Sequence, residues 1–132
     1  MRPTTTNEIA GLLEKQWMRT LCGGDPRAMV SLYAPSAILV PTFGPAPLVG
    51  RAALLGYFRN FLGDHPQLCG HVRSSHALSL GPGRLVSSGL YLFHWKGQKG
   101  TESQAARFTY VFQREKDGRW SIVTHHSSAV PA

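Results

Sequence analysis

Hydrophobic residues follow two different periods along the chain. In the first half they recur every three or four positions, which predicts amphipathic helices over about 7–21 and 51–62. A Thr-x-x-Glu motif at 5–8, just before the first of these, is typical of a helix start. Asp25-Pro26 predicts the start of another short helix, because Asp accepts hydrogen bonds from free backbone N–H groups and Pro fits the first turn.

In the second half the period changes to two, which is the spacing of side chains on one face of a β-strand. Turns rich in glycine and proline separate the alternating runs, and Lys116-Asp117-Gly118 is a hairpin signal. Together with one short apolar run in the first half, the pattern predicts strands over 37–40, 69–80, 85–95, 103–114 and 120–128.

Helices followed by antiparallel strands indicate an α+β fold. A long curved sheet wrapped around one long helix would form a cone, with a pocket between its concave face and the helices. The length of 132 residues suits a single domain of this kind over 1–132. The architecture is that of the nuclear transport factor 2-like fold, which hosts many activities and therefore assigns no function by itself.

Composition narrows the function classes. The formal net charge is +7, but the basic residues are scattered, whereas a nucleic-acid-binding face gathers them, so we predict no nucleic-acid partner. We also predict no membrane partner, because no apolar run approaches the roughly 20 residues that span a bilayer. The first residues lack the layout of a secretory signal, and Cys22 and Cys69 form no metal-binding spacing. We therefore predict a cytoplasmic protein with two reduced, mostly buried thiols.

The string Thr124-His125-His126-Ser127-Ser128 ends the last predicted strand. Strict alternation places His126 and Ser128 on the face shared with Ile122, and His125 and Ser127 on the opposite face. A histidine with a hydroxyl two residues away can position and deprotonate a small nucleophile such as water. The sequence thus predicts a polar site at this end of the sheet.

Other polar residues extend this candidate site. Thr42 follows a short strand, Tyr57 lies on the third helix, and Arg107 lies on a central strand where a charge needs a partner. The acidic residues are predicted to lie elsewhere, in caps and turns or, like Glu8, Glu14 and Glu115, on the surface. A carboxylate base in the pocket is therefore not expected. The adjacent His125 and His126 point apart, which disfavours a shared metal ion.

Several short motifs occur in an order that resembles a known family. They are Gly24-Asp25-Pro26, Leu32-Tyr33-Ala34-Pro35, Leu39-Val40-Pro41-Thr42, Tyr57-Phe58-x-x-Phe61-Leu62, Ala106–Phe112 and His125-His126-Ser127-Ser128-x-x-Pro131. Together they resemble bacterial relatives of the calcium/calmodulin-dependent protein kinase II association domain. More narrowly, they resemble iota-class carbonic anhydrases, whose domains end in a His-His-Ser-Ser motif.

The resemblance implies reversible hydration of CO2 to bicarbonate in a small pocket. By this resemblance the bicarbonate is held by catalytic residues Thr42, Tyr57, His126 and Ser128. Further candidates for substrate binding are Arg107, Thr109, His125 and Ser127. Some members of that class work without a metal and others with manganese, so we expect no cofactor and leave manganese and zinc open.

Two alternatives remain open. A non-catalytic oligomerisation domain would have an occluded pocket, whereas a SnoaL-like binder or enzyme would have a deep pocket of several hundred Å³. The Pro-rich loop 43–49 is unlike the polar loop expected in the family and adjoins the candidate site. We expect a homodimer or higher homo-oligomer in each case, with an aromatic interface if one sheet face is the outer one. The residues of that face would be Tyr91, Phe93, Trp95, Phe108, Tyr110 and Phe112.

Overall fold

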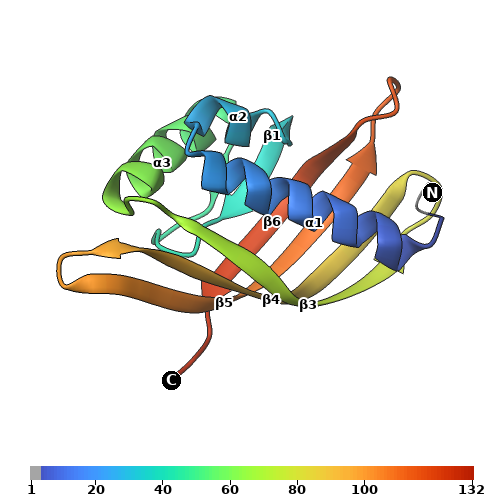
Figure 1. The fold of residues 1–132 in the computed structure, drawn as a ribbon. Helices are drawn as coiled ribbons and strands as arrows, with labels where there is room; N and C mark the ends of the chain where they lie inside the picture. The colour runs from blue at the N-terminus through green and yellow to red at the C-terminus, as the bar shows by residue number, and fades with distance from the viewer. Residues whose placement is uncertain (1–3) are drawn as a thin grey trace.

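The computed structural model describes residues 4–132. Helices dominate the first half and long strands the second, which confirms the predicted α+β class (Figure 1). The elements are α1 (Thr6–Gly23), α2 (Pro26–Val30), β1 (Tyr33–Val40), β2 (Leu48–Val49), α3 (Arg51–Asp64), β3 (Cys69–Ser79), β4 (Arg84–Gly97), β5 (Gly100–Arg114) and β6 (Trp120–Ala129).

Side-chain caps fix where the first two helices begin. The Thr5 hydroxyl accepts a hydrogen bond from the backbone N–H of Glu8 at 3.1 Å, as the capping motif predicts. The Asp25 carboxylate accepts from the backbone N–H of Arg27 at 3.0 Å at the start of α2. Between them, Gly24 ends α1 in the left-handed region with φ of 75°, where glycine has no Cβ penalty.

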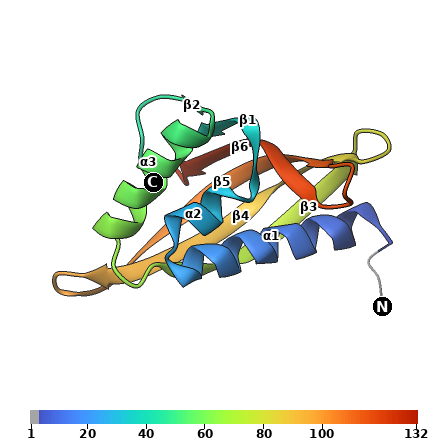
Figure 2. The ribbon, with the colours of Figure 1, turned by 90° about the horizontal axis from the view of Figure 1, so that it is seen from above.

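The strands form one six-stranded sheet in the order β2-β1-β6-β5-β4-β3. Neighbouring strands are antiparallel except β1 and β6, which pair in parallel and bring the two halves of the chain together. The helices lie against one side of this curved sheet, with α1 running along it (Figures 1 and 2). We call the side that faces the helices the inner face and the opposite side the outer face.

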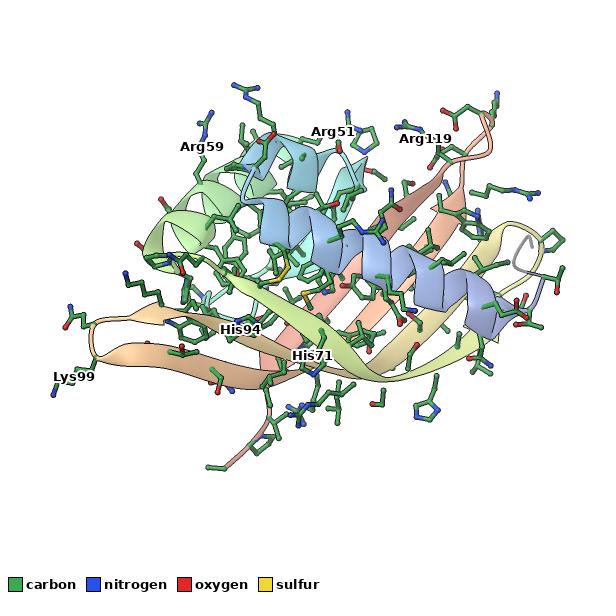
Figure 3. The ribbon with its side chains drawn as sticks, viewed as in Figure 1. Arg51, Arg59, His71, His94, Lys99 and Arg119 are labelled. Atoms are coloured by element: carbon green, nitrogen blue, oxygen red, sulfur yellow. A yellow bond between two sulfur atoms is a disulfide. The ribbon has the colours of Figure 1, made fainter. Side chains whose placement is uncertain are left out.

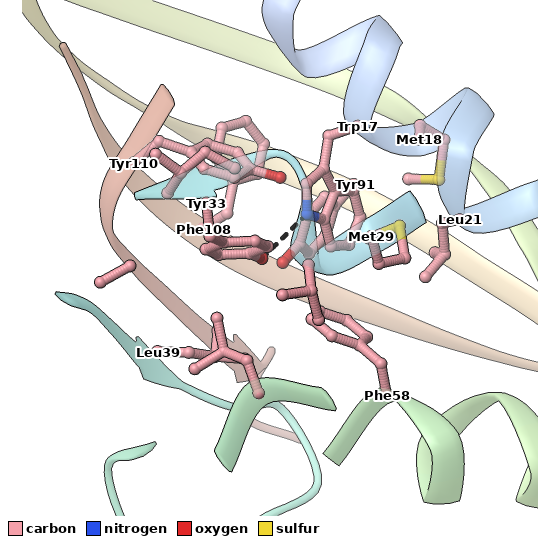
Figure 4. Packing of buried hydrophobic residues seen from close by; sticks show 14 of the residues in the cluster. Trp17, Met18, Leu21, Met29, Tyr33, Leu39, Phe58, Tyr91, Phe108 and Tyr110 are labelled. Carbon is pink, nitrogen blue, oxygen red and sulfur yellow. Dashed lines mark hydrogen bonds between the residues drawn. The ribbon is translucent and has the colours of Figure 1, made fainter. Parts of the chain in front are cut away.

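The large aromatic residues of β4 and β5 lie on the inner face and build the core. Tyr91, Phe93, Phe108, Tyr110 and Phe112 are all buried, and several pack around Trp17 of α1 (Figure 4). An aromatic interface was expected only if this face was the outer one, and the structure makes it the inner face. Alternation identifies residues that share a face, but only the position of the helices decides which face is covered.

Cys22 and Cys69 form a disulfide that ties the end of α1 to the start of β3, with their Cα atoms 4.4 Å apart (Figure 3). The prediction of two reduced thiols is wrong, because the fold brings together two cysteines that lie 47 positions apart in the sequence. Disulfides persist mainly in oxidising compartments, so the cytoplasmic location stays a prediction. Within residues 4–132 no helix has the length and apolar character to cross a bilayer.

Candidate functional site

A β-bulge in β6 decides which side chains of the terminal motif point inward. Phe112 of β5 pairs with Ile122, but Val111 pairs with Thr124, so Val123 is an extra residue. One extra residue shifts the alternation, and every later side chain changes face. As a result His125 and Ser127 are buried on the inner face opposite Tyr110 and Phe108.

Four of the candidate residues meet around one small cavity. Thr42 follows β1, Tyr57 projects from α3, and His125 and Ser127 come from β6. The cavity holds about 10 Å³, which is room for the centre of roughly one water molecule. Its remaining wall is mainly apolar and aromatic, formed by Trp17, Leu39, Pro41, Phe58, Phe61, Tyr91 and Phe93.

A continuous chain of hydrogen bonds runs from α1 to this cavity. The Trp17 indole Nε1 donates to the Tyr33 hydroxyl at 3.0 Å (Figure 4). That hydroxyl lies 2.8 Å from Nδ1 of His125. Nε2 of His125 lies 3.2 Å from the Tyr91 hydroxyl, which donates to the Ser127 hydroxyl at 2.5 Å. A short contact between the hydroxyls of Ser127 and Thr42 ends the chain.

The chemistry of the donors fixes the direction in which these hydrogen bonds are donated. An indole N–H can only donate, so the Tyr33 oxygen accepts it and the Tyr33 proton is free for Nδ1 of His125. The imidazole proton then belongs on Nε2, which donates to Tyr91, and Tyr91 in turn donates to Ser127. Ser127 can pass its proton toward Thr42, which leaves the hydroxyls of Thr42 and Tyr57 for a molecule in the cavity.

Burial keeps every ionisable group of the network neutral near pH 7. Desolvation lowers the pKa of His125 from 6.5 to about 3, with a smaller contribution from neighbouring His126. Desolvation also raises the pKa of Tyr33, Tyr57 and Tyr91 far above the ordinary tyrosine value. A neutral imidazole and neutral hydroxyls suit a neutral ligand, and none of the described residues that line the cavity carries a charge to offset that of an anion.

The other four candidate residues lie on the outer face of the sheet, away from the cavity. His126 and Arg107 are exposed, and Ser128 pairs with Arg107 across β5 and β6. The Thr109 hydroxyl is hydrogen-bonded to Ser88 at 2.6 Å. The expectation that His126, Ser128, Arg107 and Thr109 contact a ligand in the pocket is wrong in its geometry. The bulge at Val123 turns His126 and Ser128 outward, whereas Arg107 and Thr109 alternate along β5 with the inward-facing aromatic residues.

One buried acid also differs from expectation. Glu14 of α1, predicted to lie on the surface, is only 1% exposed and accepts a hydrogen bond from the Ser75 hydroxyl at 2.8 Å. Burial raises the pKa of its carboxyl, with Ser87 and Ser75 opposing that shift. Glu14 lies four residues after Ala10 and three before Trp17, both buried, so helical periodicity could have identified it. It does not line the cavity.

Tyr33 and Tyr91 are the network residues that sequence reasoning missed. Tyr33, which begins β1, stood out in the sequence only as part of the motif Leu32-Tyr33-Ala34-Pro35, and Tyr91 was grouped with an aromatic interface. Both rings are fully buried, and each hydroxyl bonds one nitrogen of His125. A buried tyrosine generally needs a hydrogen-bond partner, but the sequence does not reveal which partner.

The donor set of the cavity does not fit a metal ion. His125 is its one imidazole, no carboxylate lines it, and manganese prefers carboxylate, carbonyl and water oxygens. Within residues 4–132 no group of three or more His, Cys, Asp or Glu side chains is arranged to hold a metal. No step of the chemistry below therefore runs through a metal.

Comparison with known proteins identifies the family. The family model for the calcium/calmodulin-dependent protein kinase II association domain matches residues 5–131, nearly the whole chain. The chain belongs to this association-domain family. Whether a member of the family also catalyses a reaction depends on the site each chain builds in its cone.

Solved structures agree with this assignment. A Xanthomonas campestris protein assigned to the same association domains is 31% identical, with 98% of this chain and 90% of that chain covered and a TM-score of 0.87. A nuclear transport factor 2-like protein from Streptomyces avermitilis has 21% identity, covers 99% and 100% of the two chains and has a TM-score of 0.85. At that identity the second structure supports the fold alone.

Proposed function

We propose that this chain is a self-associating domain whose cone also carries a small reaction cavity, and that the reaction is reversible hydration of CO2. The association-domain family supports self-association most directly. The proposed reaction rests on one observation. A cavity the size of a water molecule is lined by the polar groups of His125, Ser127, Thr42 and Tyr57 together with apolar and aromatic side chains.

Self-association would use the outer face of the sheet. The helices pack on the inner face (Figure 2). The outer face carries exposed leucines, with Leu78 at 70% and Leu90 at 40% exposure. Exposed apolar groups on one sheet face are stabilised when a second copy covers them. Analytical ultracentrifugation tests this part, and a monomer at all concentrations would contradict it.

The size of the cavity favours a very small substrate. A site of about 10 Å³ has no room for a ligand with several rings unless the aromatic wall moves. Water fits, and for CO2 to lie beside it the apolar wall formed by Leu39, Phe58 and Phe61 would have to move outward. A neutral, apolar substrate next to an ordered water is the arrangement that CO2 hydration requires.

The residues of the cavity supply positioning and charge stabilisation. The hydroxyls of Thr42 and Tyr57 would hold the water, whose oxygen forms a bond to the carbon of CO2. The electrons of one C=O bond then move to oxygen, and hydroxyl donors stabilise the developing negative charge. The water loses a proton in this step, and His125 is the one imidazole or carboxyl group among the cavity residues. It can accept that proton at Nε2 only when its own proton has first moved to Nδ1 and the hydroxyls of Tyr91, Ser127 and Thr42 have reversed their donor direction.

The low pKa of His125 makes this proton transfer dependent on the product. In the empty cavity the imidazole, with a pKa of about 3, is a poor base near pH 7. A bicarbonate beside the ring would favour the protonated form through charge attraction and raise that pKa. Proton and bicarbonate would therefore enter and leave the cavity as a pair.

Stopped-flow measurement of CO2 hydration by chelator-treated protein tests the reaction. A rate above that of buffer, abolished by Ser127→Ala, would support it. If the protein still assembles but hydrates CO2 no faster than buffer does, the proposed reaction is refuted. The chain would then be a non-catalytic association domain, which is the second function that the family favours.

A further inference from the structure

We propose that Phe43 is the specificity-determining residue of this cavity, because its ring closes the passage between the cavity and the surface and limits entry to molecules of the size of CO2. This inference rests on the proposed function, since it concerns what reaches His125. Phe43 belongs to a cluster that we call the aromatic plug, which consists of Phe43, Phe61, His65 and Trp95.

The four rings of the plug pack directly on one another. The centroid of Phe61 lies 5.7 Å from that of Phe43 and 4.9 Å from that of His65. Phe43 stacks on His65 at 5.1 Å, and Trp95 meets His65 edge-on at 4.7 Å. His65 is held in turn by donating from Nδ1 to the backbone carbonyl of Phe61 at 2.7 Å.

Phe43 packs against one ring that lines the cavity and against another that lines a surface groove. Phe61 lines the cavity, while Trp95 lines a surface groove of about 900 Å³. The groove is also bordered by Pro66 and by the charged side chains of Asp64, Lys96 and Glu102. On a direct route from this groove to His125, a molecule would have to displace rings of the plug.

Phe43 is the ring most easily removed from this barrier. It is 43% exposed, whereas Phe61 is buried in the core. Its loop is stiffened by Pro41, Pro45 and Pro47, whose rings restrict the backbone. The adjacent Thr42 hydroxyl reaches the cavity, so the same short segment supplies both a ligand contact and the closure.

Removing the Phe43 ring, as in Phe43→Ala, would therefore join the groove to the cavity and admit a planar aromatic molecule. The vacated space is bordered by the rings of Phe61, His65 and Trp95, which suit stacking with another ring. Phenol is an appropriate probe, because it fills the volume of the missing ring and its hydroxyl can bond to the polar network.

The test is phenol binding to the full chain, measured by calorimetry and by NMR of the histidine rings. We expect Phe43→Ala to bind phenol at least about tenfold more tightly than the wild type, with shifted His125 resonances. Val49→Ala, an exposed change at the other end of the same loop, should behave like the wild type. If Phe43→Ala does not fold, Phe43→Leu should show a smaller gain in the same direction.

Equal phenol affinity in the wild type and the folded variant would overturn the inference, as would binding that leaves the His125 resonances unmoved. The readout does not depend on CO2 hydration. A variant that gains phenol binding while the wild type shows no hydration would refute the proposed reaction and keep the role of Phe43.

Discussion

Adjacent residues of identical type have opposite environments at the end of β6. His125 is buried and bonded to two tyrosine hydroxyls, while His126 is exposed; Ser127 is buried and Ser128 lies on the outer face. The sequence identifies the residue types of the site, but alternation alone places the wrong pair inside. The bulge at Val123 has no mark in the sequence, so the inward pair could not be predicted from periodicity.

Acid should destabilise the fold through His125. Its pKa is about 3 when folded and about 6.5 when unfolded, so below pH 6.5 the unfolded chain binds a proton that the folded chain does not. The stability that His125 contributes is therefore present above pH 6.5 and lost as pH falls toward 3, at up to about 1.4 kcal/mol per pH unit. Urea unfolding of the wild type and His125→Gln at several pH values measures this.

His125→Gln should show a shallower decline than the wild type in the free energy of unfolding as pH falls from 6.5 toward 3. His126→Gln serves as the matched control, because its side chain is exposed on the outer face. Parallel curves for the wild type and His125→Gln would contradict the burial of a neutral imidazole.

Glu14 should produce a dependence of opposite sign. Burial raises its folded pKa above 4.5, so its contribution to stability is greatest below pH 4.5 and is lost as pH rises through the folded pKa. Glu14→Gln keeps the shape and cannot ionise, so it should gain stability relative to the wild type as pH rises above 4.5. A difference between the two unfolding free energies that is the same below pH 4.5 and at neutral pH would refute the prediction.

At the scale of elements, local sequence signals predict the helices well, but they do not predict which distant segments come into contact. The caps at Thr5 and Asp25 and the hairpin signal at Lys116-Asp117-Gly118 all act over a few residues, and each appears where the sequence predicts it. β2 has only two residues and lies in a Pro-rich segment, so it was expected to be loop. The parallel pairing of β1 with β6 and the disulfide are long-range contacts that no local pattern encodes.

The Cys22–Cys69 disulfide should stabilise the joint between α1 and β3. Replacing both cysteines by serine should lower the free energy of unfolding by roughly 2–4 kcal/mol, because the bridge closes a long loop in the unfolded chain. Chemical denaturation with and without a reducing agent measures the effect, and the double variant should be insensitive to the reductant. Alkylation of both cysteines in the native protein without a reductant would contradict the bridge.

At the scale of the whole molecule, the cone separates two surfaces with different uses. Its interior holds the hydrogen-bond network and the cavity, and its outer face carries exposed leucines among polar and basic residues. The basic residues are dispersed: Arg59, Lys99 and Arg119 lie at well-separated places on the molecule (Figure 3). The outer face is thus the part of the surface best suited to a second copy.

A charge on the outer face should disrupt assembly. Leu90→Asp places a carboxylate at the centre of the proposed interface, where burial without a partner is unfavourable, so the variant should shift toward monomer. Leu12→Asp changes a leucine of comparable exposure on α1 and should leave the assembly intact. Sedimentation velocity at matched concentrations compares them, and equal behaviour of the two variants would exclude the outer face as the interface.

The central claim is that the inward face of β6 carries the chemistry. Stopped-flow CO2 hydration of the wild type, Ser127→Ala and Ser128→Ala tests it most directly, because the two variants remove the same hydroxyl from neighbouring residues. We expect Ser127→Ala to lose at least about a hundredfold in rate, comparable to removing one preorganised hydrogen-bond donor, and Ser128→Ala to retain the wild-type rate. Loss of activity in Ser128→Ala with retention in Ser127→Ala would contradict the account.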